Sequence, residues 1–291
     1  MSRFLLYIDI LGFSEMTRAE PRKVARVYSI LDTLNAHHQT NFSTIVFSDT
    51  ILVYNTADAD TDPVREDCVW LLTEFAEDLH HRLTGQDIYF RAVLVEGDFT
   101  HYRLDNVECF FGGALIDAYN AEKGIPSLGL FMSTECLKYN RFFRTASFSD
   151  NFEFVYLNRS LEDLNNFSRG SYPFDPKLPG DDYAPNVPWQ VRFLKDIHHQ
   201  MRSHKSPLVR VKFLTAWDFY YKRYPEMLQA LVEQHFDLSA LGPIGQWKDL
   251  EAAMEKDIKY FKRIGSGTPL SLALTKTYKK KKPLGGTTPK V

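Results

Sequence analysis

The chain has 291 residues, enough for one large domain or for a medium domain with an extension, and we expect the second arrangement. Its composition, 44% hydrophobic and 25% charged, is that of an ordinary globular protein, and 35 basic against 37 acidic side chains leave a formal net charge of -2. This balance indicates neither a nucleic-acid partner nor a membrane partner.

The cysteines and the lack of long apolar runs both bear on the cellular compartment. Cys68, Cys109 and Cys136 are an odd number at unrelated spacings, which favours a reducing environment. A membrane-spanning helix needs about 18 consecutive apolar residues, and no run in the sequence approaches that length. Asp9 interrupts the apolar segment that a signal peptide would need. We therefore expect a cytoplasmic protein.

Hydrophobic periodicity predicts alternating strands and helices in the first half of the chain. A tight hairpin is predicted with the polar pair Ser48 and Asp49 at its tip. Pro21 and Pro63 suit the first turns of two predicted helices. The predicted elements are a buried strand over 4–9, a helix over 22–34, a tight hairpin over 43–54, a helix over 62–83, strands over 87–97 and 106–111, a helix over 112–123 and a strand over 128–132. This order predicts an α/β (α+β sandwich) domain over residues 1–135.

The second half of the chain has a different pattern. Residues 136–188 are rich in aromatic residues and proline, and we expect an irregular connection there. Apolar residues at helical spacing predict a mostly helical extension over 189–275. The final 276–291, which includes the four lysines Lys279 to Lys282, is expected to be a disordered basic tail.

Two aspartates mark possible chemistry in the first half. Asp9 follows a buried strand and Asp49 lies at a hairpin tip, so the two carboxylates converge if their strands are neighbours. A shared divalent cation would keep both carboxylates ionised, because facing carboxylates otherwise repel each other. Acids at strand ends are also common caps and loop formers, and the spacing by itself favours that structural interpretation.

The sequence around Asp9 resembles the opening motif of class III adenylate and guanylate cyclases, an apolar strand followed by Asp-Ile-x-Gly-Phe-Ser or Thr. Phe47-Ser48-Asp49 takes the place of the family's hairpin Gly-Asp, Arg91 to Gly97 matches its Arg-x-x-x-x-x-Gly strand, and Gly112 to Asn120 resembles its glycine-led helix. The resemblance covers roughly residues 1–135. It implies that Asp9, Ile10 and Asp49 bind the metal ions and that the nucleotide is bound by Ile10, Leu11, Gly12, Phe13, Ser14, Phe47 and Arg91.

The chain also departs from the family pattern. Ile45 stands where adenylate cyclases have a purine-reading lysine, and Ile116 and Asn120 fall where the family has the asparagine and arginine that stabilise the transition state. The nearby side chains that could replace this pair are those of Asp117, Lys123 and Arg91. Arg91 is equally open to a second interpretation, as a strand residue paired with a surface acid.

These departures are similar to those of the bacterial pyrimidine cyclases of anti-phage signalling, of the Pycsar type. The shared features are the Tyr-Ile-Asp-Ile-Leu-Gly-Phe opening, Ser-Asp in the hairpin and the Gly-Ala-Leu-Ile-x-Ala-Tyr helix. The resemblance implies conversion of UTP or CTP to a 3′,5′-cyclic monophosphate and pyrophosphate with two Mn²⁺ or Mg²⁺ ions, in a homodimer, and a separate effector that senses the product. With Ile45 at the base-reading position, uridine is the first choice, cytidine is the second, and Phe47 or Tyr54 could stack on the base.

Two other functions remain open from the sequence. A cyclase-fold module that binds a nucleotide without converting it would explain the missing asparagine and arginine, although it would have little need for both Asp9 and Asp49. A signalling scaffold built around the helical half would retain its function in cells when either aspartate is replaced by asparagine.

Overall fold

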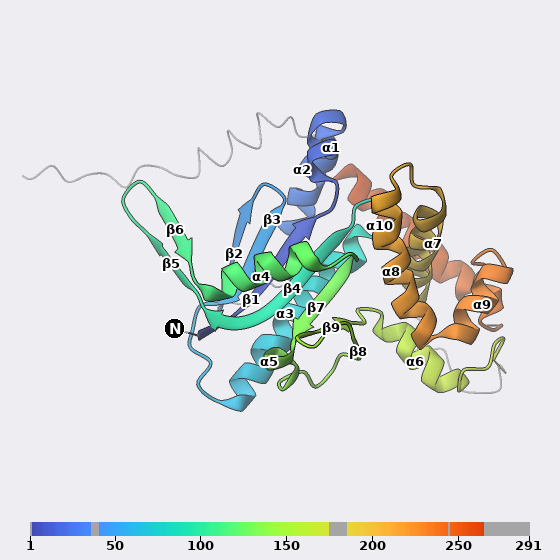
Figure 1. Cartoon of the computed structure of the whole chain (residues 1–291). Coiled ribbons are helices and arrows are strands. Elements are labelled where there is room, and N and C mark those ends of the chain that lie inside the picture. The colour runs from blue at the N-terminus through green and yellow to red at the C-terminus, as the bar shows by residue number, and fades with distance from the viewer. Residues whose placement is uncertain (1, 36–40, 175–184, 244, 265–291) are drawn as a thin grey trace, which may run out of the picture.

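The computed structural model of the chain describes residues 2–35, 41–174, 185–243 and 245–264. A seven-stranded sheet lies at the centre, in the order β2-β3-β1-β4-β7-β9-β8 (Figure 1). All neighbouring strands are antiparallel except β4 and β7, which run parallel. The strands are β1 (Ser2–Ile10), β2 (Phe42–Phe47), β3 (Thr50–Asn55), β4 (Phe90–Asp98), β7 (Gly129–Ser133), β8 (Thr145–Ser147) and β9 (Phe152–Val155). The predicted α/β fold is confirmed.

Helices cover both faces of the sheet. Leu6 and Ile8 of β1 pack against α2 (Pro21–Leu31) and α3 (Asp62–Leu83) on one face. Leu5 and Tyr7 point to the other face, towards α4 (Gly113–Gly124). This alternation follows from the two-residue period of a strand, and it places every second residue of β1, including Asp9, on the α4 face. The short helices α1 (Phe13–Ala19) and α5 (Thr134–Leu137) follow β1 and β7.

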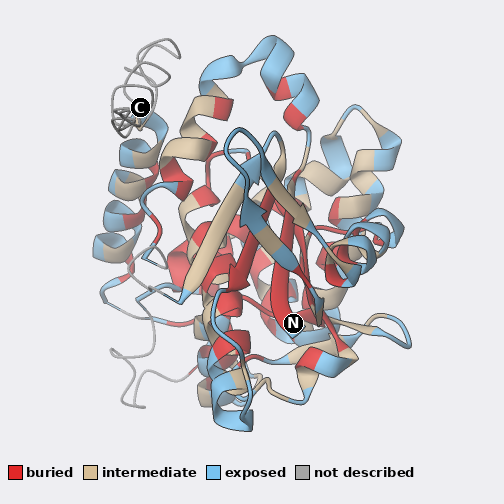
Figure 2. Cartoon of the chain, turned by 90° about the vertical axis from the view of Figure 1, so that its left-hand side faces the viewer, coloured by how far each residue is buried: buried red, intermediate tan, exposed pale blue. Residues whose placement is uncertain are grey.

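A second, two-stranded sheet projects from the body of the molecule (Figures 1 and 2). It consists of β5 (Thr100–Arg103) and β6 (Glu108–Phe111). The strand expected over 106–111 therefore exists, but it pairs only with β5 and adds nothing to the central sheet. The large apolar side chains that this ribbon exposes are Tyr102, Leu104, Val107 and Phe111.

The structure corrects the expectation of an irregular connection over 136–188. This segment contains β8 and β9, which complete the central sheet, and α6 (Arg159–Ser168). The sheet thus continues to Val155, beyond the expected boundary at residue 135. Strands of three or four residues are too short to show a clear alternation, so the sequence pattern did not reveal them.

The helical extension packs directly on the sheet. It contains α7 (Val187–Ser203), α8 (Pro207–Arg223), α9 (Pro225–Glu233), the 3₁₀ helix η3 (Leu238–Ala240) and α10 (Trp247–Arg263). Phe219 of α8 stacks on Phe154 of β9 with ring centroids 4.3 Å apart, and one hydrophobic core joins the sheet to the helices. The expected basic tail over 276–291 lies outside the described residues.

Candidate active site

Asp9 and Asp49 lie side by side at one edge of the central sheet. Asp9 pairs with Thr50 of β3 and, on its other side, with Arg91 of β4. Asp49 belongs to the turn between β2 and β3, and its carbonyl accepts a hydrogen bond from the amide of Ile10 at 3.0 Å. The two acids therefore come together because β1 and β3 are hydrogen-bonded neighbours, the condition on which their convergence depended.

The tight turn that carries Asp49 has a strained residue before it. Ser48 has a φ of 57°, in the left-handed region that favours glycine. Glycine would adopt this backbone conformation without strain, whereas serine does so at a cost. Tyr28 supports the turn by donating its hydroxyl to the Ser48 carbonyl at 2.9 Å.

Burial and neighbouring charges of both signs set the pKa of Asp9. Burial raises the pKa of Asp9 above its usual value, and the negative charge of Asp49 adds to the rise, while the positive charges of Arg91 and Lys212 oppose it. Among the described residues no group of three or more His, Cys, Asp or Glu side chains could hold a metal ion. Two carboxylates still fit Mg²⁺ or Mn²⁺, because such ions are commonly held by one or two carboxylates together with substrate phosphates.

Arg91 is held in a buried cluster beside Asp9. Its guanidinium forms an ion pair with Glu122 of α4, donates to the carbonyl of Ile125 at 2.5 Å, and lies 3.7 Å from the nearest oxygen of Asp9. The Glu122 side chain is only 7% exposed, so the acid that pairs with Arg91 is a buried one, which corrects the interpretation with a surface acid. Burial lowers the pKa of Arg91, and the Asp9 charge opposes that change.

The loop after Asp9 turns sharply into α1. Gly12 has a φ of 74°, and a Cβ there would meet no atom within 4 Å, so the space around it is open. The amides of Ile10 and Leu11 already donate to the carbonyls of Asp49 and Tyr89. Of the five residues expected to bind nucleotide in this loop, only Gly12, Phe13 and Ser14 are left to offer amides, and the Phe13 side chain is buried in the core.

The two aromatic candidates for stacking on a base differ in exposure. Tyr54 is 6% exposed, and its hydroxyl lies 2.5 Å from Nδ1 of His101. Phe47 is 72% exposed at the end of β2, next to the turn that carries Asp49. Ile45 is half-buried two residues earlier, on the same face of β2 as Phe47. Phe47 is thus the ring that a ligand at this edge of the sheet can reach.

The α4 side chains at the positions of the family's asparagine and arginine, and the two α4 residues considered as their substitutes, are exposed. Ile116 is 60% exposed, and Asp117 and Asn120 are exposed as well. The ammonium of Lys123 lies 3.9 Å from the centre of the Tyr119 ring, a cation–π contact. None of these side chains is among the groups that set the charge environment of Asp9.

One residue near Asp9 was missed by the sequence analysis. Lys212 belongs to α8 of the helical extension, is half-buried, and interacts electrostatically with both Asp9 and Arg91. The only sequence signal was its place beside Phe213 in a predicted helix, which does not reveal what the helix packs against. The proximity of Lys212 to Asp9 is a result of the tertiary fold and could not be read from the sequence.

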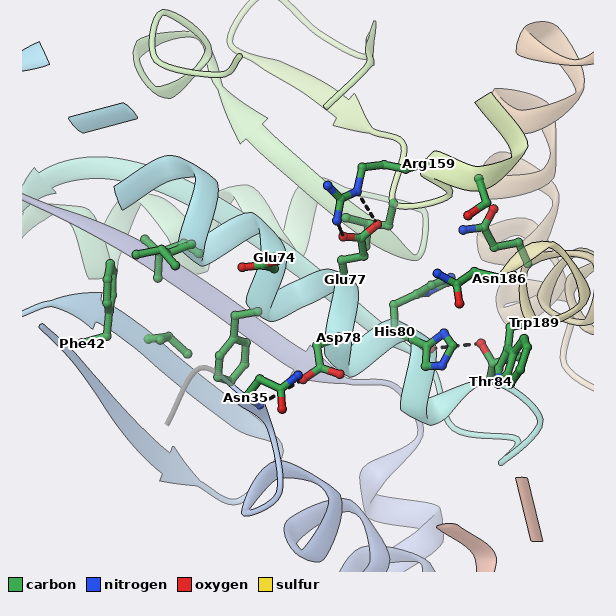
Figure 3. Close-up of a pocket in the computed structure, with 18 of the residues that line it drawn as sticks. Asn35, Phe42, Glu74, Glu77, Asp78, His80, Thr84, Arg159, Asn186 and Trp189 are labelled. Atoms are coloured by element: carbon green, nitrogen blue, oxygen red, sulfur yellow. Dashed lines mark hydrogen bonds and ion pairs between the residues drawn. The ribbon is translucent and has the colours of Figure 1, made fainter. Parts of the chain in front are cut away.

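A cavity of about 610 Å³ lies elsewhere, between α3, α6 and the start of α7 (Figure 3). Its lining includes the acids Glu74, Glu77, Asp78 and Asp163, with Arg159 paired to Glu77. Because carboxylates repel phosphate groups, this cavity does not suit a nucleoside triphosphate. It belongs to the α3 face of the sheet and is separate from Asp9 and Asp49.

Comparison with known proteins gives matches among solved structures only. No protein-family model and no curated protein matches the chain. The chain is similar to the guanylyl cyclase Cya2 (14% identity, 53% of this chain and 91% of that chain, TM-score 0.39). It is also similar to the monomeric guanylyl cyclase domain of the RhoGC fusion protein from the aquatic fungus Blastocladiella emersonii (18% identity, 53% of this chain and 94% of that chain, TM-score 0.43). A third similar structure is the adenylyl cyclase CyaB from P. aeruginosa (12% identity, 53% of this chain and 93% of that chain, TM-score 0.38). The similarity covers about half of this chain.

Helices long and apolar enough to cross a membrane do not occur in the described part of the chain.

Proposed function

We propose that this protein is a nucleotide cyclase that converts UTP to 3′,5′-cyclic UMP and pyrophosphate. The observation that carries the proposal is the placement of Asp9 and Asp49 side by side at an open sheet edge, next to the exposed ring of Phe47. The reaction forms a bond between the ribose 3′-oxygen and the α-phosphorus, breaks the bond from that phosphorus to pyrophosphate, and releases the 3′-hydroxyl proton. Cyclisation of CTP is the alternative reaction at the same site.

Each residue at the site has a role in this proposed reaction. Asp9 and Asp49, with the backbone carbonyl of Ile10, would hold two Mn²⁺ or Mg²⁺ ions. Such ions lower the pKa of the attacking hydroxyl and neutralise the leaving pyrophosphate. Arg91 holds the Asp9 carboxylate in place from within its buried cluster, so we assign it a positioning role in preference to direct phosphate contact.

The preference for a pyrimidine base rests on β2. Ile45 offers no hydrogen bond where a purine-reading lysine would stand, and Phe47 supplies an exposed aromatic face on the same strand. Stacking on an aromatic ring accepts any base, so these residues support loss of purine reading more than they select uridine over cytidine.

A homodimer is supported by large apolar side chains exposed on β2, α4 and β6. Val46 and Phe47 of β2, Ile116 and Tyr119 of α4, and Phe111 of β6 are all exposed. Val46 and Phe47 lie together beside the turn that carries Asp49, and neighbouring exposed apolar side chains on a globular protein indicate a protein interface. We propose that two copies of the chain pair through it, in the cytoplasm, and that a separate effector senses the cyclic product during defence against phage.

The test is incubation of the purified protein with ATP, GTP, CTP or UTP and Mn²⁺, with products identified by mass spectrometry. Cyclic UMP, or cyclic CMP, should form with the unsubstituted protein and with the control D150N, because Asp150 is exposed in the turn between β8 and β9. It should disappear in D9N and D49N, because one carboxylate cannot hold two divalent ions.

A different outcome would favour the second candidate, a nucleotide-binding module without turnover. The exposure of Ile116 and Asn120 where the family has its transition-state pair is the observation in its favour. Binding of a nucleoside triphosphate without a cyclic product from any of the four nucleotides would establish that function and refute the cyclase.

A further inference from the structure

The amino-terminal half of α8 is fixed against the loop that carries the candidate site. The Phe213 ring packs edge-on against Tyr89 with centroids 4.8 Å apart, and the Tyr89 carbonyl accepts the amide of Leu11 at 2.9 Å. Just before α8, Lys205 forms an ion pair with Glu15 of α1, with Nζ 2.8 Å from Oε1. Figure 1 shows α8 beside this end of the sheet. The helical extension therefore forms one wall next to Asp9.

Lys212 is the cation on this wall. It directly precedes the buried Phe213, its side chain is half-buried, and its charge acts on both Asp9 and Arg91. Within the described ranges Lys212 makes no ion pair with a carboxylate, whereas Lys222, ten residues further along the same helix, pairs with Asp218 at 2.6 Å. The Lys212 ammonium thus lies near the site without a carboxylate of its own.

The other cation near Asp9 is already engaged. Arg91 pairs with Glu122 and donates to Ile125 inside a buried cluster, and the α4 lysine, Lys123, lies over the Tyr119 ring. A phosphate group that approaches Asp9 would therefore meet Lys212 as the available positive charge. A flexible, half-buried ammonium is well suited to this task, because partial burial strengthens its attraction to phosphate.

We propose that Lys212 binds the β and γ phosphates of the nucleotide at the Asp9–Asp49 site of its own subunit. The helical extension, to which no role is otherwise assigned, then supplies a catalytic residue in place of the arginine that α4 lacks. This inference rests on the proposed function, since it requires a nucleoside triphosphate at this site.

The test is the affinity of the purified full-length chain for 3′-deoxynucleoside triphosphates, which lack the attacking hydroxyl, in the presence of Mn²⁺. Isothermal titration calorimetry is carried out with the unsubstituted protein and with K212M, K212R and K222M. Loss of one charge-assisted contact should weaken triphosphate binding by K212M about 10- to 100-fold. K212R should lose less than K212M, because it retains the charge, and K222M should bind like the unsubstituted protein.

A second ligand separates contact with the phosphates from a general effect on Asp9. The affinity of K212M for the matching 3′-deoxynucleoside monophosphate, which has no β or γ phosphate, should stay within about threefold of the unsubstituted value. Circular dichroism checks that K212M is folded. Triphosphate affinity of folded K212M equal to that of the unsubstituted protein would overturn the assignment of Lys212, and equal weakening for both ligands would do the same. Failure of the unsubstituted protein to bind any of the four triphosphates would overturn the proposed site itself.

Discussion

The buried pair of Arg91 and Glu122 gives a prediction whose size follows from burial. The two side chains are 9% and 7% exposed, so removing either one leaves an uncompensated charge inside the protein. Such a change costs about 3–5 kcal/mol of unfolding free energy, whereas exchanging both members for apolar residues is often close to neutral. We therefore expect R91M and E122M each to be destabilised by about 3–5 kcal/mol and the double variant R91M/E122M by less than either.

The double variant should not recover the full stability of the protein. The Ile125 carbonyl loses its donor in both variants that lack Arg91, and an unsatisfied buried acceptor costs about 1–3 kcal/mol. Urea unfolding followed by circular dichroism measures all four free energies, and linear extrapolation gives the coupling between the two residues. The exposed pair of Arg141 and Glu66 is the matched control, and R141M should lose no more than about 1 kcal/mol.

Activity in the same variants separates stability from positioning. R91M/E122M should be inactive even though it is more stable than either single variant, because the Asp9 carboxylate has lost the cation that holds it. Additive losses in R91M and E122M would refute the buried ion pair. A double variant with normal cyclase activity would refute the positioning role that we assign to Arg91.

Two further predictions concern the core. Burial lowers the pKa of His80 from 6.5 to about 4, so its contribution to stability is present above pH 6.5 and is lost as the pH falls towards 4. The unfolding free energy should fall over that range by about 3 kcal/mol more in the unsubstituted protein than in H80Q, while H199Q, at an exposed histidine of α7, should behave like the unsubstituted protein. F154A should cost about 3–5 kcal/mol, because the Phe154 ring is 1% exposed and stacks on Phe219. Its unfolding, followed by circular dichroism and by tryptophan fluorescence, should show one shared transition, and two separate transitions would contradict a common core.

The parts of the fold that could be predicted from the sequence are its long periodic segments. The helix expected over 62–83 coincides with α3, and the expected hairpin corresponds to β2 and β3, because each has a strong period and clear turn signals. The helix α1 was missed because it is only seven residues long and lies where a loop was expected. β8 and β9 were missed for the same reason of length, so the sheet was thought to end too early.

The candidate site was predictable only where it is local in sequence. Asp9 and Asp49 were found because each follows a recognisable strand and motif, and β1 and β3 do pair. The partner of Arg91 could not be found in this way, since nothing in the sequence marks Glu122 as the acid that Arg91 meets. The sequence did not indicate that Lys212 lies near Asp9, because its position depends on how α8 packs against Tyr89.

The charged residues at this edge of the sheet come from distant parts of the sequence, and their charges nearly balance. Asp9, Asp49 and Glu122 carry three negative charges against the two positive charges of Arg91 and Lys212, which leaves one net negative charge. A triphosphate brings about four more negative charges, and two divalent ions balance about that number. Under the proposed function, nucleotide and metal ions would therefore favour each other's binding at this edge. Arg91 is neutralised by Glu122, so neither Arg91 nor Lys212 alone would attract the triphosphate without the metal ions.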